Sequence, residues 1–75
     1  MEVDLIVETP QGKIFAIEIK SKPLPIYSDF RAGFAAMKAL EPSAQCICCC
    51  TGDTVRIVEG YEVLPYEHVL VKIFE

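Results

Sequence analysis

The sequence contains no apolar run that approaches the roughly 18 residues needed to cross a membrane as a helix. It begins Met-Glu-Val-Asp, without the positively charged segment that opens a secretory signal peptide. We therefore expect a cytoplasmic protein with no membrane contact. The chain also lacks a G-x-x-x-x-G-K-[ST] phosphate-binding loop, so we expect it to bind no nucleotide.

Basic residues are also few. The chain has 7 lysines and arginines against 11 aspartates and glutamates, for a net charge of −4. Proteins that bind nucleic acid usually carry a basic surface, and the nearest approach to one here is Lys20, Lys22 and Arg31. We therefore expect at most weak binding of nucleic acid. The acidic balance does not exclude a metal-dependent nuclease, because metal-binding carboxylates lower the net charge.

The sequence has no second cluster of soft metal ligands. All four cysteines lie at positions 46, 48, 49 and 50, and the single histidine, His68, stands apart. Zinc sites generally draw pairs of ligands from two separated segments. We therefore interpret residues 45–51 as a strand buried on both faces, in a reducing compartment, with cysteine as a small hydrophobic residue. Positions 46, 48 and 50 should share one face, and positions 47 and 49 the other.

Apolar residues, by contrast, are abundant. They make up 52% of the chain. Seventy-five residues are enough for one domain, but folding buries only about 60% of the surface of a chain this short. That leaves more apolar surface than the interior can take up. We therefore expect a homodimer in which a second copy covers part of this surface.

Near the N-terminus, two runs of alternating polar and apolar residues flank a Pro-Gln-Gly tripeptide at positions 10–12. This pattern predicts a β-hairpin with strands over 2–9 and 13–20. If the tripeptide is a three-residue loop with Gly12 in the left-handed conformation, facing residue numbers sum to 22. The apolar hairpin residues then share one face: Val3, Leu5, Val7, Phe15, Ile17 and Ile19.

The other face of this hairpin collects charge. Asp4 falls opposite Glu18, and Glu2 falls opposite Lys20. Facing Cβ atoms are about 4.5–5.5 Å apart, so two ionised carboxylates there call for a cation. Mg²⁺ and Mn²⁺ prefer oxygen ligands, which makes Asp4, Glu18 and Glu2 candidate metal ligands. Lys20 could orient or deprotonate a metal-bound water, or stabilise charge on a phosphate.

Two other interpretations of these charges stay open. Acids and a lysine on one face of a hairpin also form a solvated surface with a cross-strand ion pair. Alternatively, Asp4 and Glu18 could serve as a general acid–base pair, although the sequence shows no substrate pocket for one.

The remaining elements complete a small mixed β-sheet. Ser28-Asp29 predicts the N-cap of a helix over 29–40. Its apolar stripe should dock on the apolar face of the hairpin: Phe30, Gly33, Phe34, Met37 and Leu40. The strand over 45–51 should lie parallel to one hairpin strand. A further strand near 54–58, an extended piece at 61–64 and a short helix over 66–74 follow. The apolar face of this last helix is Val69, Leu70, Ile73 and Phe74.

Asp4, a turn, and then Glu18-Ile19-Lys20 resemble the PD-(D/E)XK signature of restriction-endonuclease-like nucleases. The wording EVDLIVET…GKIFAIEIKSK, with a late VLPYEHVL, resembles over nearly the whole chain the nuclease-like C-terminal domain, of unknown function, of many prokaryotic AAA-type ATPases. The resemblance implies that Asp4 and Glu18 hold a metal with the carbonyl of Ile19, and that Lys20 positions the attacking water. Val3 stands where the signature has proline.

The resemblance implies an α/β fold with a partial restriction-endonuclease-like core. Residues 1–75 would be a single nuclease-like domain, without the N-terminal helix that usually leads into the hairpin. We interpret the chain as a stand-alone remnant of such a domain, acting as a non-catalytic dimerisation or interaction module. The alternative is an active nuclease that uses Mg²⁺ or Mn²⁺ and cleaves nucleic-acid phosphodiesters with Asp4, Glu18 and Lys20.

Overall fold

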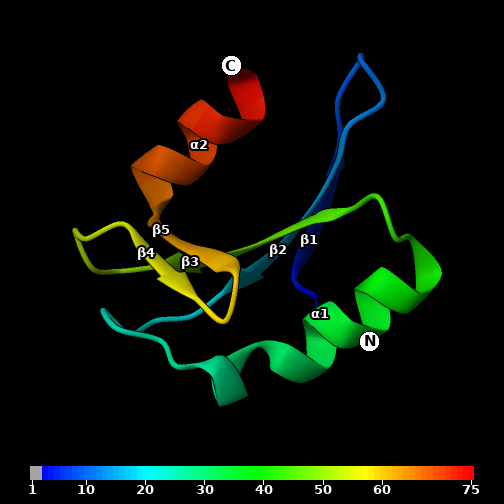
Figure 1. The fold of residues 1–75 in the computed structure, drawn as a ribbon. Helices are drawn as coiled ribbons and strands as arrows, with labels where there is room; N and C mark the ends of the chain where they lie inside the picture. The colour runs from blue at the N-terminus through cyan, green and yellow to red at the C-terminus, as the bar shows by residue number, and fades with distance from the viewer. Residues whose placement is uncertain (1–2) are drawn as a thin grey trace.

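The computed structural model describes residues 3–75 and arranges them as a five-stranded mixed sheet with an α-helix on each face (Figure 1). The elements, in chain order, are β1 (Leu5–Glu8), β2 (Ile14–Ile19), the 3-10 helix η1 (Tyr27–Asp29), α1 (Arg31–Leu40), β3 (Gln45–Cys50), β4 (Arg56–Val58), β5 (Tyr61–Pro65) and α2 (Tyr66–Phe74). The predicted α/β class and mixed sheet are therefore confirmed.

The strands are ordered β1-β2-β3-β5-β4 across the sheet. β2, β3 and β5 run parallel in the middle, and the edge strands β1 and β4 are antiparallel to their neighbours. The predicted parallel pairing of the third strand with the hairpin is confirmed. The extended piece near residue 61 proves to be a full strand, because its backbone pairs with β3 on one side and β4 on the other.

The hairpin register is the predicted one. Leu5 pairs with Ile17 and Glu8 with Ile14, so facing numbers sum to 22. Gly12 has a φ of 87°, in the left-handed region that glycine adopts without a steric penalty. The turn closes through a hydrogen bond from Gly12 N to Thr9 O at 2.9 Å.

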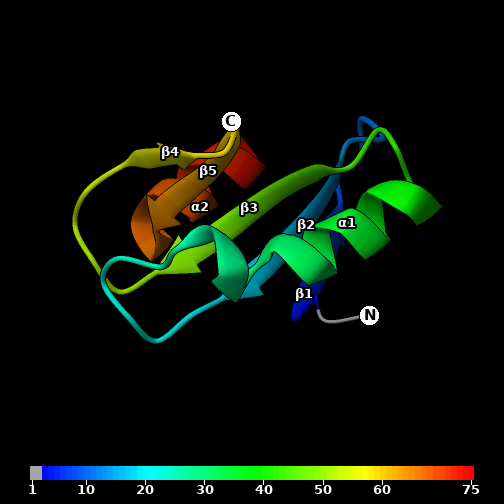
Figure 2. The same ribbon diagram turned by 60° about the horizontal axis from the view of Figure 1, so that its bottom comes forward.

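The prediction of which sheet face receives α1 is wrong. α1 packs on the side of the sheet that carries Ala16, whereas the face with Phe15 and Ile17 packs against α2. Figure 2 shows α1 in front of the sheet and α2 behind it. The small side chains of Ala16 and the cysteines leave room there for Phe34 and Met37 of α1 and for Phe30, which directly precedes the helix. The buried members of this α1-side core include Phe30, Phe34, Met37, Cys46, Cys48 and Cys50.

The helix ends also differ from the prediction. α1 begins at Arg31, and the N-cap is Phe30, without a side-chain hydrogen bond. Asp29 reaches back to accept a hydrogen bond from Ile26 N at 2.8 Å, so it closes the 3-10 turn before α1. Leu40, predicted as part of the apolar stripe, is 71% exposed at the end of the helix.

In α2 only half of the predicted apolar face is buried. Val69 and Ile73 lie in the core, whereas Leu70 and Phe74 are exposed. None of the helices that the structure describes is long and apolar enough to cross a bilayer.

The cysteine-rich strand behaves as predicted. Cys46, Cys48 and Cys50 face α1, while Ile47 and Cys49 face α2. All four thiols are free and buried. Burial raises the pKa of Cys48 to about 12, so this thiol stays protonated at neutral pH.

The loop between β2 and η1 lies against the end of β3. Thr51 N donates to Lys22 O at 3.2 Å, and Arg56 Nη1 donates to Pro25 O at 2.8 Å. Gly52 packs so closely on Pro23 that an added Cβ would overlap the Pro23 carbonyl.

We therefore expect Gly52→Ala to destabilise the fold by about 1–3 kcal/mol, the usual cost of overpacking. Urea unfolding followed by circular dichroism measures this difference. Thr51→Ala, at the exposed neighbouring position, is the matched control and should stay close to wild type. If Gly52→Ala were as stable as that control, the loop that contains Pro23 would have to shift without any loss of stability.

Candidate functional site

The predicted catalytic residues that the structure describes come together at the carboxyl end of β2. Glu18 lies near the end of the strand, Lys20 directly follows it, and Asp4 directly precedes β1. Asp29 also acts electrostatically on Lys20. In open α/β sheets, the carboxyl ends of parallel strands are where ligands bind. The fourth predicted site residue, Glu2, and its pairing with Lys20 lie outside the described residues.

Glu18 is a buried acid. The residue is 5% exposed, opposite Cys48 in the parallel ladder, and on the sheet face that α1 covers. Its Oε2 lies 3.3 Å from Lys20 Nζ. Side chains two residues apart on a strand share a face, which places this ion pair along one strand. A simple solvated face therefore does not describe Glu18, because a buried carboxylate needs a charged or hydrogen-bonding partner.

Lys20 is held in its charged form. The hydrogen bond to Glu18 raises the pKa of Lys20, and this effect outweighs the opposing effect of burial. The negative charges of Glu18, Asp29 and Asp4 raise the pKa of Lys20 further. A lysine that stays protonated can orient water or stabilise an anion, but it cannot accept a proton. The ion pair with Glu18, together with the raised pKa of Lys20, thus favours an orienting role for Lys20 over the deprotonating one.

Asp4 completes the end of the hairpin ladder. Hydrogen-bonded rungs recur at every second residue of an antiparallel pair, and the donor on β2 that follows the Leu5–Ile17 rung is the N–H of Ile19. Asp4 Oδ2 accepts this hydrogen bond at 2.8 Å. The side chain thus takes the place of a backbone carbonyl, and β1 begins one residue later. The predicted Asp4–Glu18 facing pair falls one step beyond the last described rung.

A second ion pair, which the sequence analysis did not predict, flanks this cluster. Lys22 Nζ lies 3.0 Å from Asp29 Oδ2. The hydrogen bond from Ile26 N, and then the one from Lys22, lower the pKa of Asp29. Lys22 is therefore engaged with a carboxylate. The signal that could have identified Asp29 is its position three residues after Ile26, where an acid closes a helical turn.

The described residues fit a divalent ion only in part. Asp4 already accepts the Ile19 N–H, and Glu18 already holds Lys20. Within residues 3–75, no group of three or more His, Cys, Asp and Glu side chains is placed to hold a metal. An ion bound between Asp4 and Glu18 would have to compete with Lys20 for Glu18.

Two replacements of Asp4 distinguish the contribution of its hydrogen bond from the contribution of its charge. We expect Asp4→Ala to destabilise the protein by about 1 kcal/mol, because the Ile19 N–H loses its acceptor. Asp4→Asn should retain most of the stability, since an amide oxygen also accepts. Chemical denaturation measures both, with Glu8→Ala at the other end of β1 as control. If Asp4→Ala and Asp4→Asn were both more stable than wild type, the result would instead indicate that they relieve repulsion between the carboxylates of Asp4 and Glu18.

The lowered pKa of Asp29 predicts a pH dependence. Its ionised form contributes stability above the ordinary pKa of 3.8, and this contribution is lost as the pH falls through the lower folded-state value. Asp29→Asn should therefore be less stable than wild type at neutral pH and equal to it well below pH 3.8. Urea midpoints across this range measure the difference. Asp53→Asn, in an exposed loop, is the control variant, and a difference in stability between Asp29→Asn and wild type that persists in acid would contradict the assignment.

The cluster at the end of β2 is thus a set of mutually engaged charges built on an Asp…Glu-x-Lys pattern. Comparison of the chain with models of protein families, with curated proteins and with solved structures finds no match. A function for this chain therefore has to be inferred from its own residues.

Proposed function

We propose that this chain is a non-catalytic interaction module that retains the charged motif of a PD-(D/E)XK nuclease-like domain. The observation that carries the proposal is the engagement of the motif charges with neighbouring groups. Asp4 ends β1 by accepting the Ile19 N–H, and Glu18 holds Lys20 in an ion pair at 3.3 Å. Each charge therefore has a structural use that requires neither a metal nor a substrate.

The arrangement of strands supports the nuclease-like ancestry. An antiparallel hairpin ends in the acidic motif, and the chain then crosses through α1 to a strand parallel to β2. This is the order expected of a partial restriction-endonuclease-like core. The further likeness to the C-terminal domain of AAA-type ATPases rests on the residues quoted from the sequence.

The exposed apolar surface supports the interaction role. Among the described residues, thirteen large hydrophobic side chains are exposed, from Tyr27 at 38% to Phe74 at 81%. Apolar surface that gathers into patches marks protein–protein interaction sites. We propose that the partner is a second copy of the chain, so that light scattering should give twice the 8.4 kDa chain mass. A mass of one chain at every concentration would refute this part.

An active metal-dependent nuclease is the second candidate, and one feature favours it. The N–H and C=O of one strand residue point to the same side of the strand, so the Ile19 carbonyl points toward the side where Asp4 lies. Asp4 and this carbonyl could then share a Mg²⁺ or Mn²⁺ ion with Glu18, while Lys20 orients water. Nucleic acid would be the substrate.

Thermal melts with and without millimolar Mn²⁺ distinguish the two candidates. For a non-catalytic module we expect that Mn²⁺ leaves the melting temperature of the wild type unchanged. The Asp4→Asn and Glu18→Gln variants should be no more stable than the wild type. Lys20→Ala should lower the melting temperature, because it leaves the buried Glu18 without its cation. Glu8→Gln, an exposed acid away from the cluster, is the matched control.

If the chain is an active metal-dependent nuclease, we expect the opposite response to Mn²⁺. Mn²⁺ would raise the wild-type melting temperature, since a ligand that binds the folded state stabilises it. The two acid variants would lose this response, while Lys20→Ala would keep it and lose cleavage of DNA. That pattern would overturn the non-catalytic assignment.

A further inference from the structure

β1 forms one edge of the sheet, and its outer backbone groups face the open side. Among the strands that the structure describes, β2 is the one that pairs with β1. Thr9 N donates to Lys13 O at 2.8 Å, so the hydrogen-bonded rungs of the hairpin fall on odd-numbered residues. The N–H and C=O of Ile6 and Glu8 therefore point away from β2. Backbone groups in this arrangement are a template for one further strand.

The side chains along this edge combine an apolar centre with an acid on each side. Ile6 and Glu8 share one sheet face, because they lie two residues apart on the strand. Ala16, the partner of Ile6, belongs to the core on the α1 side, which identifies that face. Asp4 stands two residues before Ile6, and all three of these side chains are exposed. We call Asp4, Ile6 and Glu8 the β1 edge.

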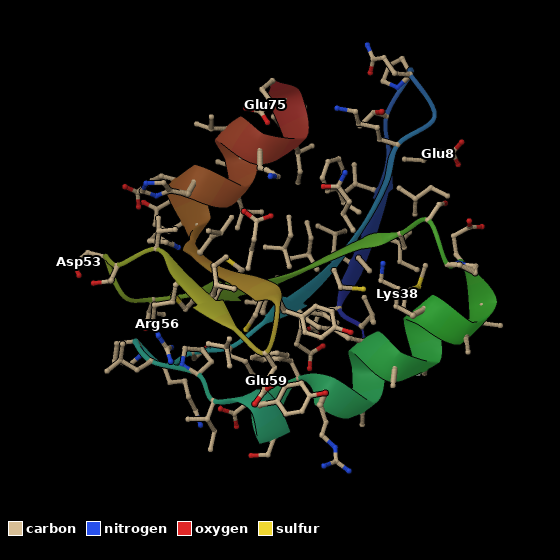
Figure 3. The ribbon with its side chains drawn as sticks, viewed as in Figure 1. Glu8, Lys38, Asp53, Arg56, Glu59 and Glu75 are labelled. Atoms are coloured by element: carbon tan, nitrogen blue, oxygen red, sulfur yellow. The ribbon has the colours of Figure 1, made fainter. Side chains whose placement is uncertain are left out.

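The β1 edge lies outside the area that the two α-helices cover. α1 packs mainly on β2, α2 packs mainly on β3 and β5, and the main contacts of β1 are with β2. Figure 3 shows Glu8 on the outer side of the hairpin, pointing away from the body of the molecule. The edge is therefore open to a further strand.

The nearest lysines do not cancel the charge of this edge. Lys20, which acts electrostatically with Asp4, is held by Glu18 at 3.3 Å. Lys13 is two residues before Phe15 and so shares its face, which packs toward α2. Lys13 therefore lies on the opposite face of the sheet from Glu8.

The acidic surface also continues past the end of β1. A hollow of about 220 Å³ lies between the hairpin turn and the end of α2. Glu8, Gln11 and Glu75 are among the residues that line it. The acids of the strand and of the helix end thus form one negative surface, which attracts a partner of positive charge.

We propose that the β1 edge binds an extended segment of a partner protein, in which basic residues flank an apolar residue at every second position. The segment adds an antiparallel strand to the sheet through hydrogen bonds to Ile6 and Glu8. Its apolar residue lies opposite Ile6, and its basic residues lie beside Asp4 and Glu8, where opposite charges stabilise a cross-strand pair. This inference goes beyond the proposed function, because it requires neither the dimer nor the nuclease ancestry.

Other pairings fit these observations less well. Antiparallel pairing of two copies centred on Ile6 sets Asp4 of one copy opposite Glu8 of the other, and like charges directly opposite each other destabilise a sheet. The other edge strand, β4, carries arginine at position 56 as its charged residue and has no acid. A basic segment therefore matches β1 better than β4, and it matches β1 better than a second copy does.

Fluorescence anisotropy with a labelled synthetic peptide tests the proposal. The probe is acetyl-Lys-Thr-Val-Thr-Lys-amide, and we expect saturable binding to the wild type at millimolar peptide or below. The control peptide has the same charge but carries an N-methyl group on the valine, which removes the N–H that faces the Ile6 carbonyl. We expect this control to bind at least about tenfold more weakly, the effect of one lost hydrogen bond.

Charge reversal on the edge gives a second readout. Glu8→Lys should weaken binding of the lysine peptide at least about tenfold, because it replaces an attraction with a repulsion. Glu67→Lys, at an exposed position in the first turn of α2, changes the net charge equally and is the matched control. It should bind the peptide nearly as well as the wild type.

Replacement of Ile6 tests the backbone contact. Ile6→Pro removes the outward N–H and should abolish binding, whereas Ile6→Val keeps that N–H and should still bind. Proline is tolerated on an edge strand where the N–H faces solvent, and circular dichroism checks the fold of both variants. If Ile6→Pro does not fold, hydrogen exchange of the wild type replaces it. The lysine peptide should then slow exchange of the Ile6 and Glu8 amides.

The outcomes separate this inference from the proposed function. A wild type that binds neither peptide would overturn the inference and leave the edge acids as a protection against self-association. Equal binding of the two peptides would also overturn it, because net charge alone would then explain the attraction. A wild-type monomer that binds the lysine peptide and discriminates against its control would refute only the dimer. Binding that is lost in the N-methyl peptide and in Glu8→Lys supports the inference.

Discussion

Burial of β3 between two helices is the constraint on which the rest of the structure depends. Its four cysteines are all buried, and three of them face α1. Because these side chains are small, Phe30 and Phe34 can lie against the sheet, while Ile47 packs under α2 on the other face. β3 also pairs in parallel with β2 and β5. The carboxyl ends of the three parallel strands therefore meet at one edge, where the charged cluster lies.

At this edge the charges stabilise one another in pairs. Glu18 is covered on the α1 side of the sheet, and Lys20 neutralises it. Asp4 replaces a backbone acceptor for Ile19 and so sets the start of β1. The same pattern of residues is compatible with an ion-pair cluster and with a metal centre. The two differ in whether Glu18 holds Lys20 or a divalent ion.

Much of the hairpin and of β3 could be predicted because each depends on residues close in sequence. A glycine at position 12 and the approximate alternation of polar and apolar residues on both sides favour one register that keeps most like side chains on one face. The face that α1 covers could not be predicted in this way. Phe15 and Ile17 mark one face of β2 as apolar, but the space for α1 lies on the other face, beside the small residues of β3. The alternation of residues along a strand shows which face of the strand is apolar, but it does not show on which face there is space for a helix.

The sequence by itself determined the register of the hairpin, the two-sided burial of β3 and the extent of α2, since local periodicity and turn residues specify each. Only the tertiary structure decided that Glu18 is buried beside Lys20, that Asp29 pairs with Lys22 instead of capping α1, and that one flank of α2 remains exposed. Each of these features depends on which sheet face a helix covers. Side chains from segments far apart in the sequence settle that by how well they fit together, and no local pattern contains this information.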